Sequence, residues 1–508
     1  MGAEPQRLHI ALFPLMAAGH MIPILDIAKL FSSYNLKTTI ITTPLNASFF
    51  TKPLQNSKHN IGIEIIPFPS KEMGLPEGIE NFDQFTSDEM SIKFLNATQQ
   101  LQHSLEQVLL KCKPNCLVSD MLFPFSVDVA AKFNIPRVVF HGTNYFSQCL
   151  THAMIKYEPY KSVLSNEEEF VIPNLPHQIL HTKSRLPSIM RGEKRDHDED
   201  DQSGEFMKVF VQALEAEEKS YGIIVNSFYE LEPDYAEHYR KVMGRKAWSI
   251  GPVSMCNREI EDKFQRGKDS GIGSHLCLEW LGSRKPNSVV YVCFGSLAEV
   301  SSLQLYQIAL GLEASGYDFI WVVRRGSGVD EEGEEEWLPL GFEKRMEGKG
   351  LIIKGWAPQM LILDHEAVGA FVTHCGWNST LEGISCGVPL VTWPVFAEQF
   401  YNEILVTQVL KIGISTGAKE WNRKVEGVIV KWEDIKEVIR RIMMGDEALE
   451  IRSRANKVKE LARKAIEVGG SSYVNMCSLI QELSTYDVTT KTRALVLEEE
   501  LQSNVALG

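Results

Sequence analysis

Short runs of aliphatic and β-branched residues alternate with helical patterns along most of this 508-residue chain. Such alternation indicates parallel sheets covered on both faces by helices. The predicted strands span residues 9–15, 38–42, 62–68, 116–120, 137–140, 222–227, 288–294, 317–323, 350–354, 368–374 and 389–395. The clearest predicted helices span residues 20–33, 89–111, 302–315 and 378–386, and only helices follow from 432 to 484. The sequence therefore predicts an α/β fold built from doubly wound sheets.

The length of the chain exceeds what one hydrophobic core supports, so two or three domains are expected. Residues 251–275 lose the periodicity and gain Gly, Ser and mixed charge, as a surface linker does. The resulting division is an N-terminal domain at 1–250, a linker at 251–275, a C-terminal domain at 276–460, a C-terminal helix at 461–484 and a tail at 485–508. Ligands of such sheets bind outside the carboxyl ends of the strands, so functional residues are expected directly after them.

The formal net charge of −14 argues against nucleic acid as a partner, because phosphate contacts need a basic face. Acidic residues gather at 195–202 and 330–337, and such runs are typical of solvated loops. Asp196 and Asp198 have the spacing of a metal-binding pair, but no strand or apolar frame surrounds them. No metal site is predicted there.

The nine cysteines are odd in number and scattered, and several lie in apolar runs. This pattern favours reduced, buried thiols in a cytoplasmic protein over a disulfide framework. No stretch of about 18 apolar residues occurs, so no integral membrane segment is predicted.

Two ionisable residues follow strands of the predicted N-terminal domain. His20 comes after the strand at 9–15, at the start of a helix, and Asp120 ends the strand at 116–120. A carboxylate that accepts the imidazole N–H fixes the tautomer and leaves the other ring nitrogen as a general base. The segment "GISCG" (383–387) matches a nucleophile elbow, but its helix precedes the strand, so no serine nucleophile is predicted. The pair therefore indicates deprotonation of a substrate hydroxyl.

The predicted C-terminal domain carries small and polar residues after two strands. Gly295 and Ser296 follow one strand, and Gly376, Asn378 and Ser379 lie at the start of a helix after another. Free N–H groups at a helix N-terminus, with hydroxyl and amide donors beside them, form an anion site. Neither a P-loop nor a G-x-G-x-x-G motif after a strand is present, which argues against a P-loop kinase and a dinucleotide oxidoreductase.

The stretch from Trp356 to Gln399 resembles from end to end the signature box of plant UDP-sugar-dependent glycosyltransferases of small molecules. "GHMIP" (19–23) and "FGS" (294–296) resemble other landmarks of this inverting family. The resemblance implies a GT-B fold, in which two Rossmann-like domains face each other across a cleft. The N-terminal domain would bind the acceptor, the C-terminal domain would bind the UDP-sugar, and the C-terminal helix would pack back on the N-terminal domain. It also implies that the UDP-sugar is a co-substrate and that neither a cofactor nor a metal is needed.

The donor-binding residues that the resemblance implies are Ser296, Trp356, Ala357, Gln359, His374, Gly376, Trp377, Asn378, Ser379, Glu382, Glu398 and Gln399. Trp356 would stack on uracil, and Gln359 and Glu382 would bond the ribose hydroxyls. The diphosphate would be held by Ser296, His374, Asn378 and Ser379, and the sugar by Trp377, Glu398 and Gln399.

The last two residues of the signature box bear on which UDP-sugar is the donor. Glu398 stands where aspartate is usual, and Gln399 resembles glucose users rather than galactose users. UDP-glucose is therefore the expected donor, with UDP-galactose or another UDP-sugar as the alternative. His20, oriented by Asp120, would deprotonate an acceptor hydroxyl, which would attack the anomeric carbon and yield a β-glucoside.

The acceptor is less constrained. Phe123, Phe125, Thr143, Tyr145 and Phe146 are expected to line an apolar pocket, and the alternative for the aromatic residues is packing in the core. Two segments, 75–85 and 396–403, resemble the family branch that acts on triterpenoid and steroid sapogenins, flavonoids and hydroxycoumarins. A triterpenoid sapogenin is the expected acceptor, with a flavonoid or a hydroxycoumarin as the alternative, and a monomer is expected.

Two other classes of protein fit the sequence less well than a transferase does. An inactive nucleotide-sugar binder would keep Trp356 and Glu382 but lose His20 or Asp120, and both of these are present. A hydrolase would need an activated nucleophile or suitably spaced paired carboxylates, and neither is evident.

Overall fold

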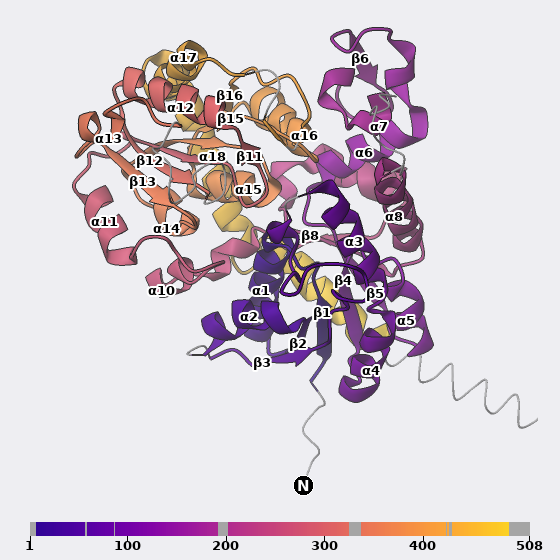
Figure 1. Ribbon diagram of the computed structural model, residues 1–508. Helices are drawn as coiled ribbons and strands as arrows, with labels where there is room; N and C mark the ends of the chain where they lie inside the picture. The colour runs from indigo at the N-terminus through magenta and orange to yellow at the C-terminus, as the bar shows by residue number, and fades with distance from the viewer. Residues whose placement is uncertain are drawn as a thin grey trace, which may run out of the picture.

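The computed structural model describes residues 7–55, 58–85, 87–191, 202–324, 337–422, 424–425 and 429–486. Most of both acidic runs, with Asp196 and Asp198, and nearly all of the predicted tail lie outside the described residues. Two parallel sheets, each flanked by helices, form two lobes that face each other (Figure 1).

The N-terminal sheet has seven parallel strands in the order β3-β2-β1-β4-β5-β8-β9. Its central strands are buried along their whole length, as expected when helices cover both faces. The strands are β1 (His9–Phe13), β2 (Lys37–Thr42), β3 (Ile61–Ile65), β4 (Cys116–Asp120), β5 (Arg137–Phe140), β8 (Gly222–Val225) and β9 (Ala247–Ser249). The strand order reverses between β1 and β4, so a crevice opens at their carboxyl ends.

The C-terminal sheet has six parallel strands in the order β13-β12-β10-β14-β15-β16. They are β10 (Val289–Cys293), β12 (Asp318–Val323), β13 (Gly350–Lys354), β14 (Val368–Thr373), β15 (Leu390–Thr392) and β16 (Gly413–Ser415). Here the order reverses between β10 and β14. Two minor sheets pair β6 (Glu169–Ile172) with β7 (Ile179–Thr182) and β11 (Glu299–Val300) with β17 (Lys424–Val425).

The helices of the N-terminal lobe are α1 (Ala18–Ser33), α2 (Ala47–Leu54), α3 (Asp88–Gln99), α4 (Gln102–Cys112), α5 (Ser126–Lys132), α6 (Tyr145–Tyr157), α7 (Ser188–Arg191), α8 (Gln202–Glu218) and α9 (Pro233–Glu237). Those that follow are α10 (Ile260–Phe264), α11 (Ser274–Gly282), α12 (Ser302–Ser315), α13 (Phe342–Arg345), α14 (Gln359–Leu363), α15 (Trp377–Cys386), α16 (Gln399–Ile404), α17 (Trp432–Met443) and α18 (Asp446–Ile466). A final helix covers residues 471–486.

The chain crosses between the lobes twice. The first crossing follows β9, and the second leads from α18 to the final helix, whose Met476, Leu479 and Leu483 share a buried cluster with Ile10 of β1. This helix appears in yellow behind the N-terminal sheet (Figure 1). The two crossings meet, because the Ser472 hydroxyl donates a buried hydrogen bond to the carbonyl of Gly251.

Several elements differ from the sequence-based prediction. The single helix predicted at 89–111 is two helices, α3 and α4, separated at Gln100 and Leu101. The hairpin β6–β7 and the three-residue strands β9 and β16 were not predicted, since runs this short carry little periodicity. The predicted linker contains the helix α10, and its Arg266 bonds residues of both lobes.

Candidate active site

The carboxyl ends of the strands at the two reversal points carry the candidate residues. His20 lies in the first turn of α1, which follows β1, and Asp120 is the last residue of β4. In the other lobe, Ser296 follows β10, and the segment from His374 to Ser379 follows β14. The α/β topology thus places these two groups at the crevices where ligands of such sheets bind.

The His20 imidazole and the Asp120 carboxylate are in direct contact. His20 Nδ1 lies 2.6 Å from Asp120 Oδ2, and the Asp120 side chain is fully buried. The other carboxylate oxygen accepts the backbone N–H of Leu122 at 3.1 Å, which fixes its orientation. With Nδ1 occupied, Nε2 is the ring nitrogen left to accept a proton from a ligand.

Two opposing effects set the basicity of His20. Burial acts to lower the pKa of the imidazole, but the charge and hydrogen bond of Asp120 outweigh it, so the pKa is raised above 6.5. The carboxylates of Glu398 and Asp83 act in the same direction. The site therefore favours the imidazolium that forms when His20 removes a proton.

The start of α15, after β14, contacts the first turn of α1, which carries His20. The Asn378 side-chain amide donates to the carbonyl of Gly19 at 2.6 Å. The Trp377 indole N–H donates to the carbonyl of Asn226 at 2.8 Å, also in the N-terminal lobe. The two halves of the candidate site are therefore joined across the cleft.

The start of α15 has the features of an anion site. The helix begins after Gly376 without a side-chain cap, and the backbone N–H of Trp377 bonds the Glu398 carboxylate, so the next N–H groups of the first turn are the ones that face a ligand. His374 packs between Gly295 and Gly376, where an added Cβ would approach its ring within 2.5 and 2.4 Å respectively. Burial lowers the pKa of His374 to about 4, so the ring is neutral at pH 7.

Residues predicted to bind uridine form a second connected group. Gln359 Nε2 donates to Glu382 Oε2 at 2.7 Å and to the Ser379 hydroxyl at 3.1 Å. Trp356 is half-buried, and its indole nitrogen has no hydrogen-bond partner among the described residues. Ala357 is buried beside it.

Two of the three predicted sugar contacts, Glu398 and Gln399, lie at the start of α16, and the third, Trp377, begins α15. Gln399 Oε1 accepts the backbone N–H groups of Val395 at 2.9 Å and of Phe396 at 3.0 Å, so its carbonyl oxygen shapes the turn. Burial raises the pKa of Glu398, and the charge of His20 and the backbone N–H of Trp377 oppose that rise. Glu398 therefore lies close enough to His20 for each charge to act on the other.

Sequence reasoning missed Asn402, which lies one helical turn after Glu398. Its amide donates to the carbonyl of Cys375 at 2.8 Å and to Glu398 Oε1 at 3.4 Å. Its oxygen accepts from Asn144 at 2.8 Å and from Ser147 at 3.0 Å, both in α6 or its cap in the N-terminal lobe. A polar residue on the buried face of a helix is the signal that points to such a role, and no helix was predicted at α16.

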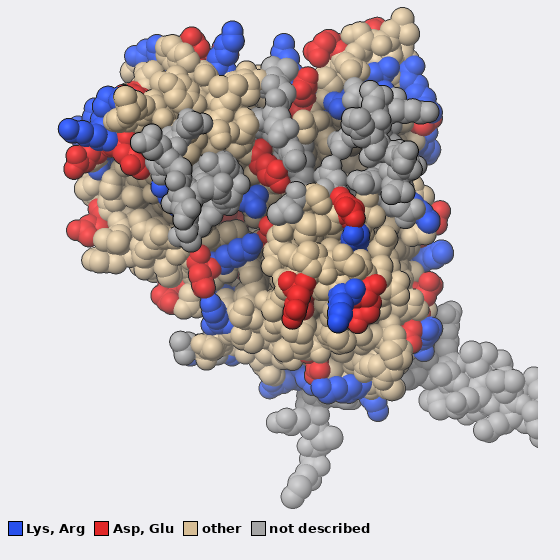
Figure 2. Space-filling view, viewed as in Figure 1, with Lys and Arg blue, Asp and Glu red and all other residues tan. Residues whose placement is uncertain are grey.

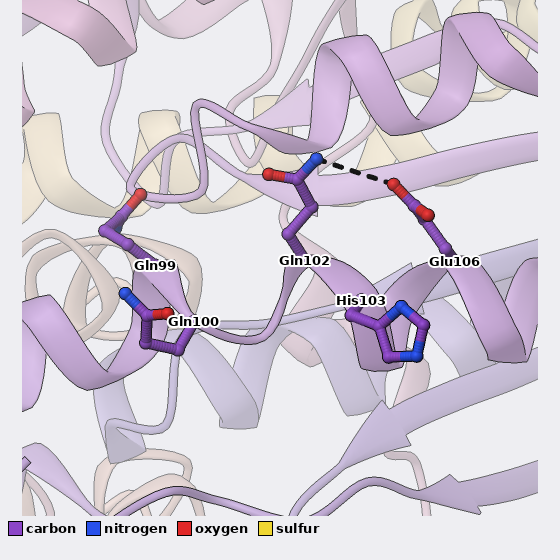
Figure 3. Close-up of a pocket in the computed structure, with 5 residues that line it drawn as sticks. All are labelled: Gln99, Gln100, Gln102, His103 and Glu106. Atoms are coloured by element: carbon purple, nitrogen blue, oxygen red, sulfur yellow. Dashed lines mark hydrogen bonds between the residues drawn. The ribbon is translucent and has the colours of Figure 1, made fainter. Parts of the chain in front are cut away.

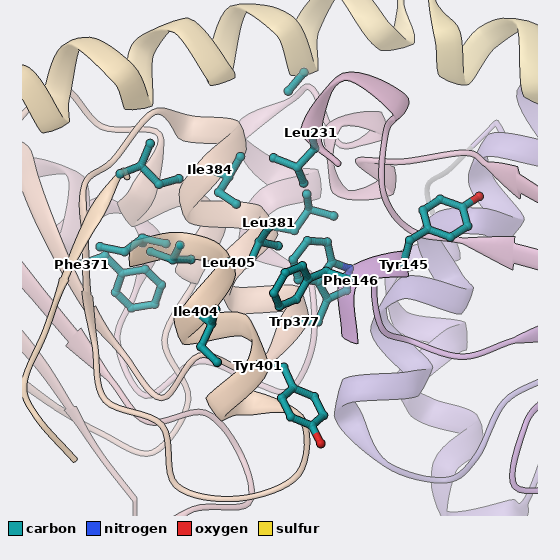
Figure 4. Close-up of a cluster of buried hydrophobic side chains, with 14 of the residues drawn as sticks. Tyr145, Phe146, Leu231, Phe371, Trp377, Leu381, Ile384, Tyr401, Ile404 and Leu405 are labelled. Carbon is teal, nitrogen blue, oxygen red and sulfur yellow. The ribbon is translucent and has the colours of Figure 1, made fainter. Parts of the chain in front are cut away.

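For three of the residues expected to line the acceptor pocket, the structure favours the alternative of packing in the core. Phe123, Tyr145 and Phe146 are fully buried. Tyr145 and Phe146 belong to the cluster that joins the two lobes and includes Trp377 (Figure 4). Phe123 stacks on Phe13. These three side chains pack in the core, whereas Phe125 and Thr143 are only half-buried.

A separate pocket of about 360 Å³ lies where α3 meets α4. Its lining residues are Gln99, Gln100, Gln102, His103 and Glu106 (Figure 3). None of the candidate residues lines it, and Gln102 and Glu106 bond each other at 3.4 Å.

In Figure 2 basic and acidic side chains intermingle over the described part of the visible face.

Comparison with known proteins identifies the class. A profile of the family described as UDP-glucoronosyl and UDP-glucosyl transferase matches residues 273–416. Scopoletin glucosyltransferase from Nicotiana tabacum is 55% identical over 491 residues, which cover 95% of this chain and 99% of that protein. UDP-glucose flavonoid 3-O-glucosyltransferase 7 from Fragaria ananassa is 53% identical over 488 residues, which cover 94% and 96%.

A solved structure gives the same result. UGT73P12 from Glycyrrhiza uralensis, complexed with glycyrrhetinic acid 3-O-monoglucuronide, matches with a TM-score of 0.88 and 40% identity over 98% of this chain and 100% of that chain. The fold is GT-B and the protein is a glycosyltransferase, as predicted. The chain belongs to the plant family-1 UDP-glycosyltransferases, whose co-substrate is a UDP-sugar. None of the described helices is long and apolar enough to cross a membrane.

Proposed function

We propose that this protein is an inverting UDP-glucose-dependent O-glucosyltransferase in which His20 is the general base. The observation that carries the proposal is the 2.6 Å contact between His20 and buried Asp120, directly across from the anion-binding turn of α15. A base on one side of the cleft and an anion site on the other suit transfer from a nucleotide to a hydroxyl.

In this mechanism His20 Nε2 removes the proton of the acceptor hydroxyl. The oxygen forms a bond to the anomeric carbon on the face opposite to UDP, and the bond between that carbon and the UDP oxygen breaks. The departing diphosphate gains negative charge, which the N-terminus of α15, Ser296 and neutral His374 would stabilise. Inversion of an α-linked donor gives a β-glucoside.

The division of labour between the lobes is part of the proposal. Residues 1–250 would bind the acceptor and residues 276–460 the donor, which the positions of His20 and α15 support. One chain supplies both half-sites, which favours a monomer. The nine cysteines are all free, which favours a cytoplasmic location.

For the acceptor we propose a phenolic hydroxyl of a hydroxycoumarin or flavonoid, with a triterpenoid sapogenin as second candidate. The relatives named for scopoletin and flavonoid transfer support the first, and the Glycyrrhiza structure with its triterpenoid glycoside supports the second. A phenol, with a pKa of about 10, yields its proton to an imidazole far more readily than an aliphatic alcohol does.

A product screen tests this function. The purified protein is incubated with UDP-glucose, UDP-galactose or UDP-glucuronate and with a hydroxycoumarin, a flavonoid or a triterpenoid aglycone, and products are detected by mass spectrometry. We expect a hexoside from UDP-glucose with a phenolic aglycone, and proton coupling at the anomeric centre should show the β configuration. An α-glycoside, or transfer only from another donor, would contradict the proposal.

The pH profile follows from the raised pKa of His20. The base is active only when deprotonated, so kcat/KM should fall as the pH drops through a value above 6.5. Asp120→Asn removes the charge that raises this pKa, so the acidic limb should move to lower pH while the maximal rate also falls. A limb that stays in place in Asp120→Asn would argue against the assignment.

Gln399→His should alter the choice of donor. The change removes an amide from the proposed sugar site, and the ratio of kcat/KM for UDP-glucose to that for UDP-galactose should fall roughly three- to tenfold. Gln399→Glu keeps the oxygen that accepts the N–H groups of Val395 and Phe396, so it separates support of the turn from contact with the sugar. An unchanged donor profile in both variants would exclude a sugar contact.

A further inference from the structure

The side chain of Arg266, in the segment between the lobes, lies between two buried carboxylates. Arg266 Nε donates to Asp26 Oδ2 at 2.8 Å, and Arg266 Nη1 donates to Glu382 Oε1. The exposed fractions of the three side chains are 8% for Arg266, 1% for Asp26 and 4% for Glu382. Asp26 belongs to α1 of the N-terminal lobe and Glu382 to α15, so one side chain joins both lobes.

Glu382 is the carboxylate proposed to accept the ribose hydroxyls of the donor, and its hydrogen-bonding capacity fits that role. An ionised carboxylate offers about four acceptor positions. Arg266 takes one on Oε1 and Gln359 takes one on Oε2. Two positions then remain for the two ribose hydroxyls.

A charge of this kind also needs compensation. A buried carboxylate without a partner of opposite charge is costly. Arg266 supplies the opposing charge, and its planar fork reaches two separate carboxylates, which the single nitrogen of lysine does not do in the same geometry.

The next residue of the segment contacts Trp356. Gly267 has a φ of +103°, and an added Cβ would come within 2.5 Å of the Trp356 ring. The backbone N–H of Gly271 also donates to the carbonyl of Trp356 at 2.7 Å. The same short segment therefore supports the residues proposed for both the ribose and the uracil.

We propose that Arg266 is a positioning residue of the donor site, which holds the Glu382 carboxylate oriented for the ribose hydroxyls and ties it to Asp26 of the opposite lobe. This inference rests on the proposed function, since it assumes that the ligand is a UDP-sugar. It assigns part of the uridine site to a segment that the sequence marks only as a linker.

The test compares UDP with 2′-deoxy-UDP as ligands in isothermal titration calorimetry, without acceptor. Wild-type protein should bind UDP more tightly than 2′-deoxy-UDP. Arg266→Gln should weaken UDP binding about 10- to 100-fold and bring the ratio of the two dissociation constants close to one. Arg266→Lys keeps the charge, so its affinity for UDP should lie between those of wild type and Arg266→Gln. This variant still tests the proposal if Arg266→Gln does not fold.

Two further variants separate this role from a general effect on the segment. Gly267→Ala should push against the Trp356 ring and weaken both ligands equally, with the ratio retained. Asp269→Asn removes only an exposed ion pair with Lys52, so both affinities should stay as in wild type.

Each outcome decides a different question. If wild-type protein binds no UDP, the proposed function fails. If Arg266→Gln and Arg266→Lys lose affinity but keep the wild-type ratio, Arg266 does not act through the ribose, and the inference fails alone. Tighter UDP binding in Arg266→Gln would mean that Arg266 competes with ribose for Glu382, which also overturns the inference.

Discussion

Replacing His20 by alanine is expected to lower kcat by about 10²–10⁴-fold, the usual loss when a general base is removed. Asp120 Oδ2 lies 2.6 Å from His20 Nδ1, so His20 Nε2 is the atom that accepts the proton of the acceptor hydroxyl. Alanine removes this proton acceptor, whereas the residues proposed to bind UDP lie in the other lobe and are unchanged. Single-turnover rates with saturating donor and acceptor measure the effect.

The matched measurement is the affinity for UDP, which should remain close to that of wild type in His20→Ala. Asp120→Asn should retain the His20 imidazole, but the ring should lose its fixed orientation and part of its basicity. The single-turnover rate of Asp120→Asn should therefore lie between those of wild type and His20→Ala. A His20→Ala variant with near-normal turnover would show that another group, or the acceptor itself, supplies the base.

Replacing Trp377 by alanine is expected to destabilise the folded protein by about 3–5 kcal/mol, the typical cost of deleting a buried tryptophan side chain. Trp377 is 2% exposed, packs within the cluster that joins the lobes, and donates its N–H to Asn226. Its indole therefore belongs to the interface between the lobes (Figure 4). Thermal and urea unfolding measure the loss.

Trp377→Phe is the control, since it retains most of the apolar surface and loses the hydrogen bond. Trp377→Phe should lower the free energy of unfolding by less than Trp377→Ala does. We expect a loss of about 1–3 kcal/mol, because the Asn226 carbonyl is left without its indole donor. If Trp377→Ala unfolded like wild type and lost only affinity for UDP-glucose, the indole would act mainly on the sugar.

The larger features of the fold were predictable because they repeat. Strands such as β1 and β4 are continuous apolar runs, which a parallel sheet covered on both faces requires. The carboxyl ends of these strands then locate His20 and Asp120 without further information. The roles of the donor residues came from the resemblance of residues 356–399 to a family, and not from periodicity.

The features that sequence reasoning missed depend on contacts between distant segments. Whether Tyr145 and Phe146 line a pocket or fill the core is decided by distant residues that pack against them, Tyr239 and Tyr235, which their own sequence does not encode. Arg266 stands in a polar, aperiodic segment, where a basic residue is normally solvated. Its two carboxylate partners come from α1 and α15, far away in the chain.

The meeting of the two crossings at Gly251 and Ser472 has a consequence for motion. Because the two connections touch at one place, they restrict the lobes to rotation about that place, whereas a single connection would also let them separate. Such a rotation would have to break the bonds that join the lobes elsewhere, among them those from Asn378 to Gly19 and from Trp377 to Asn226. Lobes that part in this way would return to the same alignment of base and donor site.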